Sequence, residues 1–152
     1  MSETLRDRRV RYTRSILMSP PAGLAMLGEN DDLSGLRVLV LGNAVTDTLC
    51  ALMHTECRQA ETRTPGCLTD ARSADLVLVP RLTRENVDRV INQAAHALCQ
   101  HGRIIIAMPV GQDLLSHTAM MLLGAGFELP AILGEGDRKR LSATRGPHLS
   151  RA

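Results

Sequence analysis

The sequence predicts an α/β domain built on a mostly parallel β-sheet. Three near-continuous apolar runs, at residues 36–41, 75–80 and 103–108, are typical of strands that are buried on both faces of such a sheet. Apolar residues at helical spacing follow each run. Because strands that alternate with helices are joined by right-handed crossovers, we expect helices on both faces of the sheet, and therefore a three-layer sandwich.

The 152 residues suffice for one domain of this kind with two short extensions. Residues 1–30 are predicted to form an arginine-rich helical extension. Its helix ends at Ser19-Pro20-Pro21, because the residue before a proline avoids the α conformation. The main domain is expected to span residues 31–145, and residues 146–152 to form a tail.

The first half of the main domain is predicted to contain a helix and a weaker strand after the first apolar run. Gly42 stops that run, and Thr46 or Asp47 is expected to cap the helix. The weaker strand lies around residues 58–62. The turn Thr64-Pro65-Gly66 then breaks the chain before the second apolar run.

The second half is predicted to contain two helices and a terminal hairpin. Thr83 is expected to cap the helix after the second apolar run, and His101-Gly102 to end it. The next helix, at residues 112–123, closes at a glycine-rich segment. Residues 127–133 and 140–144 are then expected to pair as a hairpin, which adds one antiparallel strand to the sheet.

Composition and charge argue against several classes of partner. With one Tyr, one Phe and no Trp, the chain lacks the exposed rings on which RNA-recognition sheets and single-strand grooves stack bases. Residues 1–14 hold five Arg against two acids, and residues 137–152 hold five basic residues against one acid. Basic ends of this kind are usually solvated, although they also suit phosphates or acidic partners.

Cysteine, histidine and hydropathy patterns point to a cytoplasmic protein without a metal. The four Cys show no C-x-x-C spacing and are expected to be reduced thiols. The five His are too scattered to supply the three or four converging ligands of a metal site. No run matches a signal peptide or approaches the length of a membrane span, so no membrane partner is expected.

Four segments, in their order and spacing, resemble class I S-adenosylmethionine-dependent methyltransferases. They are Val38–Gly42, Asp75–Leu78, His101–Ile106 and Gly124–Phe127. The resemblance covers about residues 36–144 and implies a Rossmann-like sheet with a reversed last strand. It also implies an S-adenosylmethionine site at the carboxyl ends of the strands. The residues expected to line that site are Leu41, Gly42, Asn43, Ala44, Glu61, Thr62, Pro80 and Arg81.

The sequence departs from the family pattern at several of these positions. The family's first strand normally carries an acid and leads into a G-x-G-x-G loop, whose glycines let the backbone approach the cofactor. Here Val40 stands at the acidic position, and Ala44 and Thr46 replace the second and third glycines. Glu61 is expected to take the place of the second-strand acid, which accepts hydrogen bonds from the ribose hydroxyls.

The segment between the second and third strands is also shorter than the family pattern requires. Only eight residues separate Gly66 from Asp75. One short helix alone uses about ten residues, so these eight cannot hold a helix, a strand and two loops. We therefore expect one edge strand and part of the adenine pocket to be missing.

These departures favour a degenerate, non-catalytic relative with a structural or regulatory binding role, and no catalytic residue is assigned. One alternative is a small active S-adenosylmethionine-dependent methyltransferase. The other is a module that binds nucleic acid or an acidic partner through its basic ends, with nucleic acid the less favoured partner. Apolar residues left uncovered by the missing strand favour a homodimer or a partner protein. Arg81 and Arg84, just after a strand, are candidates to recognise an anion.

Overall fold

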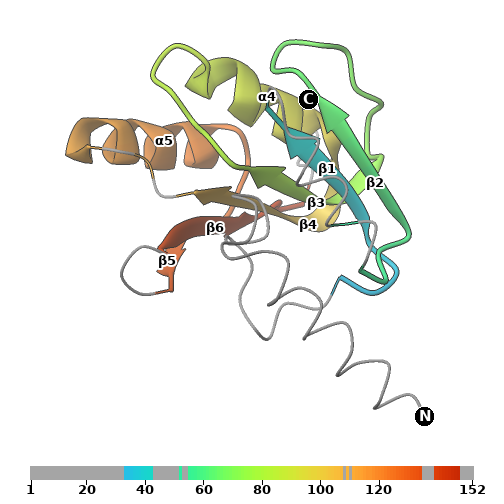
Figure 1. Cartoon of the computed structure of the whole chain (residues 1–152). Coiled ribbons are helices and arrows are strands. Elements are labelled where there is room, and N and C mark those ends of the chain that lie inside the picture. Colours follow the sequence, from blue (N-terminus) through green and yellow to red (C-terminus); the bar gives the residue numbers. More distant parts are fainter. Residues whose placement is uncertain are drawn as a thin grey trace, which may run out of the picture.

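The computed structural model describes residues 33–42, 52, 55–107, 109, 111–134 and 139–147. The predicted N-terminal helix and the helix expected to begin at Thr46 or Asp47 lie outside these residues. The described part forms one mixed sheet in the order β2-β1-β3-β4-β6-β5, with two helices (Figure 1). The elements in chain order are β1 (Arg37–Leu41), β2 (Gln59–Arg63), β3 (Ala74–Val79), α4 (Val87–Ala97), β4 (Leu98–Ala107), α5 (Gln112–Gly124), β5 (Ala131–Leu133) and β6 (Arg140–Thr144).

The parallel part of the sheet confirms the three apolar runs as buried strands. β1 pairs in parallel with β2 on one side and with β3 on the other, and β3 pairs in parallel with β4. The chain thus leaves β1 first toward one edge of the sheet and then toward the other. The carboxyl ends of β1 and β3 therefore flank a topological switch point, where α/β sheets bind ligands.

The two described helices lie side by side on one face of the sheet (Figure 1). The predicted apolar stripe of α4 is confirmed, because Val87, Val90, Ile91 and Ala94 are all buried against the sheet. Side chains from alternate strand positions form a second cluster on the opposite face. There Leu33 and Leu52 cover the sheet, at the borders of segments outside the described residues. The predicted α/β sandwich is confirmed.

Helix α4 is shorter at both ends than its sequence signals indicate. It begins at Val87 rather than directly after Thr83, and it ends at Ala97 rather than at His101-Gly102. β4 starts at once with Leu98, and its pairing with β3 shifts register between Ala74 and Leu76. Leu98 is fully buried, so its apolar character fits the strand as well as it fits a helix face.

The terminal hairpin is confirmed, but its first strand is shorter than predicted. β6 pairs antiparallel with β4, and β5 pairs antiparallel with β6 at the edge of the sheet. β5 begins only at Ala131, and Phe127 makes an isolated bridge to Arg145. Pro130 lies between the bridge at Phe127 and the start of β5. Because proline has no N–H to donate, the β-ladder is interrupted there.

The second strand, β2, forms the other edge of the sheet (Figure 1). Residues 64–73 run directly from β2 to β3 and contain no helix or strand. The sequence analysis expected one edge strand of the family to be missing after β2, and this short connection agrees with that expectation. In the described part of the chain, no helix is long and apolar enough to cross a bilayer.

Candidate functional site

A cavity of about 420 Å³ opens at the carboxyl ends of β1 and β3. Its size is within the range of small-molecule sites. It lies at the topological switch point, between the ends of these strands and the beginning of α4. The lining residues are Gly42, Pro65, Pro80, Arg81, Thr83, Glu85, Asn86 and Arg89.

Part of the lining is a fixed turn that precedes α4. The backbone N–H of Thr83 donates to Oδ1 of Asn86 at 2.8 Å, and the backbone N–H of Asn86 lies 3.3 Å from Oγ1 of Thr83. The carbonyl of Thr83 also accepts from the N–H of Val87 at 3.0 Å. These reciprocal bonds fix the turn between β3 and α4, in which Asn86 is the residue directly before the helix.

The turn after β2 also contributes to the lining, through Pro65, and Gln93 attaches this turn to α4. Oε1 of Gln93 accepts from the N–H of Gly66 at 3.0 Å, and its Nε2 donates to the carbonyl of Cys67 at 2.8 Å. Gln93 is buried, so both bonds are shielded from competing water. They hold Pro65 at the cavity. Sequence reasoning missed Gln93, although a polar side chain between Ile91 and Ala94 was a signal that a buried partner exists.

Two arginines give the cavity a basic lining. Arg81 and Arg89 are exposed, and among the described residues neither forms an ion pair or a side-chain hydrogen bond. Glu85 supplies a carboxylate on the same lining. Arg84, the other arginine considered from the sequence, is exposed and does not line the cavity.

The structure brings together three of the residues that the sequence assigned to the cofactor site. Gly42, Pro80 and Arg81 all line the cavity, and Leu41 lies just before them, fully buried in the core. Asn43 and Ala44 lie outside the described residues. The sequence missed several lining residues, above all Arg89, which comes from the first turn of α4 and has no local signal.

Glu61 lies elsewhere, in the middle of β2. In the parallel register Glu61 is opposite Leu39, and Arg63 is opposite Leu41 at the end of the strand. β2 extends two residues beyond Glu61, to Arg63, so Glu61 does not stand at the carboxyl end of its strand. Thr62 pairs with Val40, and its side chain therefore points to the face of the sheet opposite Glu61.

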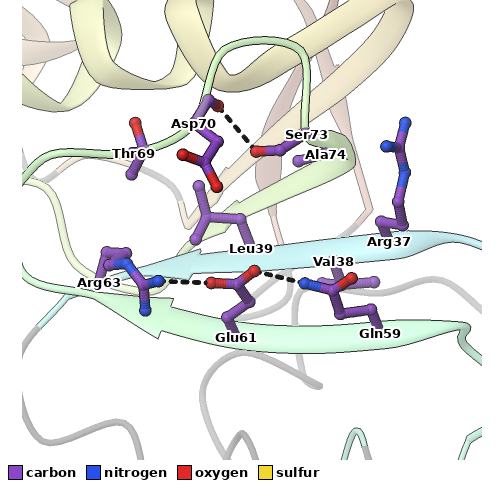
Figure 2. A pocket seen from close by; sticks show the side chains of 10 residues that line it. All are labelled: Arg37, Val38, Leu39, Gln59, Glu61, Arg63, Thr69, Asp70, Ser73 and Ala74. Atoms are coloured by element: carbon purple, nitrogen blue, oxygen red, sulfur yellow. Dashed lines mark hydrogen bonds and ion pairs between the residues drawn. The ribbon is translucent and has the colours of Figure 1, made fainter.

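Figure 2 shows the surroundings of Glu61. Its carboxylate forms an ion pair with Arg63 at 2.8 Å and accepts a hydrogen bond from the side-chain amide of Gln59. Asp70 and Ser73 border the same space from the loop before β3. This second cavity measures about 20 Å³, enough for about one water molecule and too small for a cofactor.

A third group of polar side chains joins strands at the amino end of the sheet. Asp75 on β3 accepts from the backbone N–H of Arg37 at 2.9 Å and from its Nε at 3.1 Å. Nη2 of the same guanidinium lies 3.2 Å from Asp75 and 3.0 Å from Sγ of Cys99. The hydrogen bonds from Arg37 hold the pKa of Asp75 below its usual value, against the opposing effect of burial. This cluster lies at the end of the sheet away from the larger cavity.

Metal-binding and thiol groups do not gather in the described part of the chain. Within it, no group of three or more His, Cys, Asp or Glu side chains could hold a metal ion. Cys57, Cys67 and Cys99 are free thiols there, and Cys50 lies outside the described residues.

Several solved structures with a similar fold are named methyltransferases. A methyltransferase from Pyrococcus furiosus matches with a TM-score of 0.62 and 14% identity, covering 95% of this chain and 100% of that one. Fibrillarin from Aeropyrum pernix, with natively bound S-adenosyl-L-methionine, matches with a TM-score of 0.56 and 15% identity over 81% of this chain and 72% of that one. No family model and no curated protein matches the sequence.

A third match carries a bound reaction product of the cofactor. The 1,6-didemethyltoxoflavin-N1-methyltransferase from Burkholderia thailandensis, with bound S-adenosylhomocysteine, matches with a TM-score of 0.53 and 15% identity. It covers 96% of this chain and 85% of that one. The chain thus has a class I methyltransferase-like, Rossmann-like fold, as the sequence resemblance implied.

Proposed function

We propose that this chain is a methyltransferase-like binding protein that does not transfer methyl groups and acts through a structural or regulatory role. It keeps the fold and a ligand-sized cavity at the switch point. The observation that carries the proposal is the position of the β2 carboxylate. Glu61 lies in mid-strand, bound to Arg63 and Gln59, and does not line the cavity.

The residue at the end of β2 has the wrong hydrogen-bonding chemistry for a ribose site. The resemblance implies a carboxylate there that accepts from two hydroxyls. Arg63 occupies that end, and a guanidinium only donates hydrogen bonds. Glu85 is the cavity's carboxylate, and it comes from the turn before α4 rather than from β2.

Two further observations support the loss of cofactor binding. Val40 is fully buried at the position where the resemblance implies an acid on the first strand. β2 is an edge strand, and residues 64–73 after it form neither helix nor strand. The described residues thus supply less of an adenine pocket than the resemblance implies. In addition, the arginines that line the larger cavity would repel the cationic sulfonium of S-adenosylmethionine.

Calorimetry with S-adenosylhomocysteine tests the proposal on the full chain. We expect no heat of binding and no thermal shift at about 1 mM ligand, which bounds the free energy of binding at roughly −4 kcal/mol. A competent class I methyltransferase measured in the same buffer is the positive control. Micromolar binding that is lost in Gly42→Val would overturn the proposal, because Gly42 lines the cavity.

The second candidate function is a small active S-adenosylmethionine-dependent methyltransferase. It is favoured by the fold shared with proteins whose structures hold the cofactor or its product. Methyl transfer from an activated sulfonium depends mainly on positioning, so the reaction does not require an acid–base pair. The calorimetric result above separates the two candidates.

A further inference from the structure

We propose that the cavity at the carboxyl ends of β1 and β3 binds a phosphate monoester of a non-aromatic polyol, of the sugar phosphate class. The inference rests on the proposed function, because it fills with another ligand the site that S-adenosylmethionine would take. It is argued from the charge, the backbone donors, the carboxylate and the missing rings of this cavity.

The basic lining selects an anion. Arg81 and Arg89 come from different places in the chain, the segment after β3 and the first turn of α4, and yet line one cavity. Among the described residues, neither guanidinium takes part in an ion pair. Two such groups on one cavity suit a phosphate, since each can donate two parallel hydrogen bonds to its oxygens.

The beginning of α4 borders the same cavity. The reciprocal bonds between Thr83 and Asn86 use the N–H groups of these two residues. Asn86 is the N-cap residue of the 11-residue helix α4 and Arg89 lies in its first turn, so the helix begins at the cavity. The N–H groups at the start of a helix carry partial positive charge and favour a phosphate nearby.

The carboxylate and the size of the cavity favour a phosphorylated polyol over a bare anion. Glu85 lines the same space, and an ionised carboxylate accepts hydrogen bonds from hydroxyl groups. The volume of about 420 Å³ exceeds what an inorganic phosphate fills. A ligand with a phosphate at one end and hydroxyls at the other satisfies both the arginines and Glu85.

The described part of the lining contains no aromatic ring, which argues against a nucleotide. Phe127 is buried beneath the guanidinium of Arg145, 5.8 Å from the ring centre, and does not line the cavity. Tyr12 is the chain's other aromatic residue and lies outside the described residues. No ring in the described lining stacks a base, whereas a sugar phosphate needs none.

The test measures calorimetric binding and thermal shift of the full chain with ribose 5-phosphate, inorganic phosphate, ribose and AMP. We expect ribose 5-phosphate to bind and raise the melting temperature, ribose to do neither, and AMP to gain nothing over ribose 5-phosphate. Arg81→Gln and Arg89→Gln should each weaken ribose 5-phosphate binding about tenfold. Arg84→Gln is the matched control, with a change below about twofold.

Glu85→Gln separates the polyol from the phosphate. It should weaken ribose 5-phosphate binding and leave inorganic phosphate unchanged or tighter, because it removes a hydroxyl acceptor and a negative charge. An equal loss in Arg84→Gln and Arg81→Gln would overturn the inference, since it would indicate diffuse surface attraction. So would tighter binding of AMP, or of a single-stranded oligonucleotide, than of ribose 5-phosphate.

The two proposals fail in different ways. If neither the phosphates nor S-adenosylhomocysteine bind, the sugar phosphate inference is overturned and the proposed function stands. Micromolar binding of S-adenosylhomocysteine overturns the proposed function, and this inference with it.

Discussion

Arg145 is a nearly buried cation, and its guanidinium leaves room only for glycine at residue 126. Its Nη1 donates to the carbonyl of Ala125 at 2.7 Å, and its guanidinium lies over the ring of Phe127. Gly126 has a φ of +95°, and a Cβ placed there would collide with Nη1 of Arg145. Both the backbone conformation and the close contact therefore require glycine at residue 126.

Gly126→Ala should lower the free energy of unfolding by about 1–3 kcal/mol, because it combines left-handed strain with displacement of a buried arginine. Urea denaturation measures the change. Gly124→Ala, at the end of α5, is the matched control, because a Cβ there meets nothing within 4 Å. It should be neutral or stabilising by up to about 1 kcal/mol. Equal losses in the two variants would contradict this account of Gly126.

At the scale of elements, Asp75 ties the amino ends of β1 and β3 together through Arg37. The carboxylate accepts from both the backbone and the guanidinium of Arg37, and these bonds lower its pKa. A group whose pKa is lower in the folded than in the unfolded state stabilises the fold above its unfolded pKa. That stability is lost as the pH falls below about 4 and through the folded pKa.

Asp75→Asn should therefore lower the free energy of unfolding by about 1–2 kcal/mol at pH 7, a figure reduced for the partial exposure of the pair. It should also flatten the decline of stability between about pH 5 and pH 2. Urea denaturation at several pH values measures both effects. Asp70→Asn is the control, because Asp70 is exposed and its carboxylate forms no ion pair among the described residues. A pH profile that Asp75→Asn leaves unchanged would refute the assignment.

The two edges of the sheet differ in character. β2 presents Gln59, Glu61 and Arg63, and charged side chains discourage edge-to-edge pairing. At the opposite edge, exposed apolar side chains on α5 and around β5 include Met120, Leu123, Leu129 and Ile132. Leu68, in the loop after β2, is also exposed. The expectation of a homodimer or partner protein remains a prediction.

At the scale of the whole molecule, the basic C-terminal segment is partly built into the fold. Arg140 lies on β6, which pairs with β4 and β5, and Arg145 is nearly buried. Two of the five basic residues that the sequence placed in a basic end thus belong to the sheet. Removing this segment to test for nucleic-acid binding would therefore remove a central strand together with its charge.

A chain that ends at Asp137 should show no cooperative unfolding transition, because β4 and β5 would both lose their antiparallel partner. Circular dichroism during urea titration measures this. Lys139→Gln is the control that removes charge alone. Lys139 is exposed, and the variant should stay within about 0.5 kcal/mol of the full chain. Cooperative unfolding of the shortened chain with the full chain's midpoint would show that β6 does not hold the sheet together.

The sequence by itself determined the fold class and most of the sheet. Runs such as Val38–Leu41 and Ile104–Ile106 are apolar at every position, and only strands buried on both faces require that pattern in so short a run. The order of these runs with helical segments then dictated parallel pairing. Element boundaries were less well determined, because Thr83 and Leu98 suit a helix and its flanks equally well.

Only the tertiary structure decided which side chains meet at the site. Gly42, Pro80 and Arg81 follow strands, so the rule for carboxyl ends places them together. The separation of Glu61 from them depends on the register of β2 and on where that strand ends, and the addition of Arg89 depends on where α4 begins. Register and helix position depend on contacts between residues distant in the chain, and a local sequence pattern does not predict those contacts.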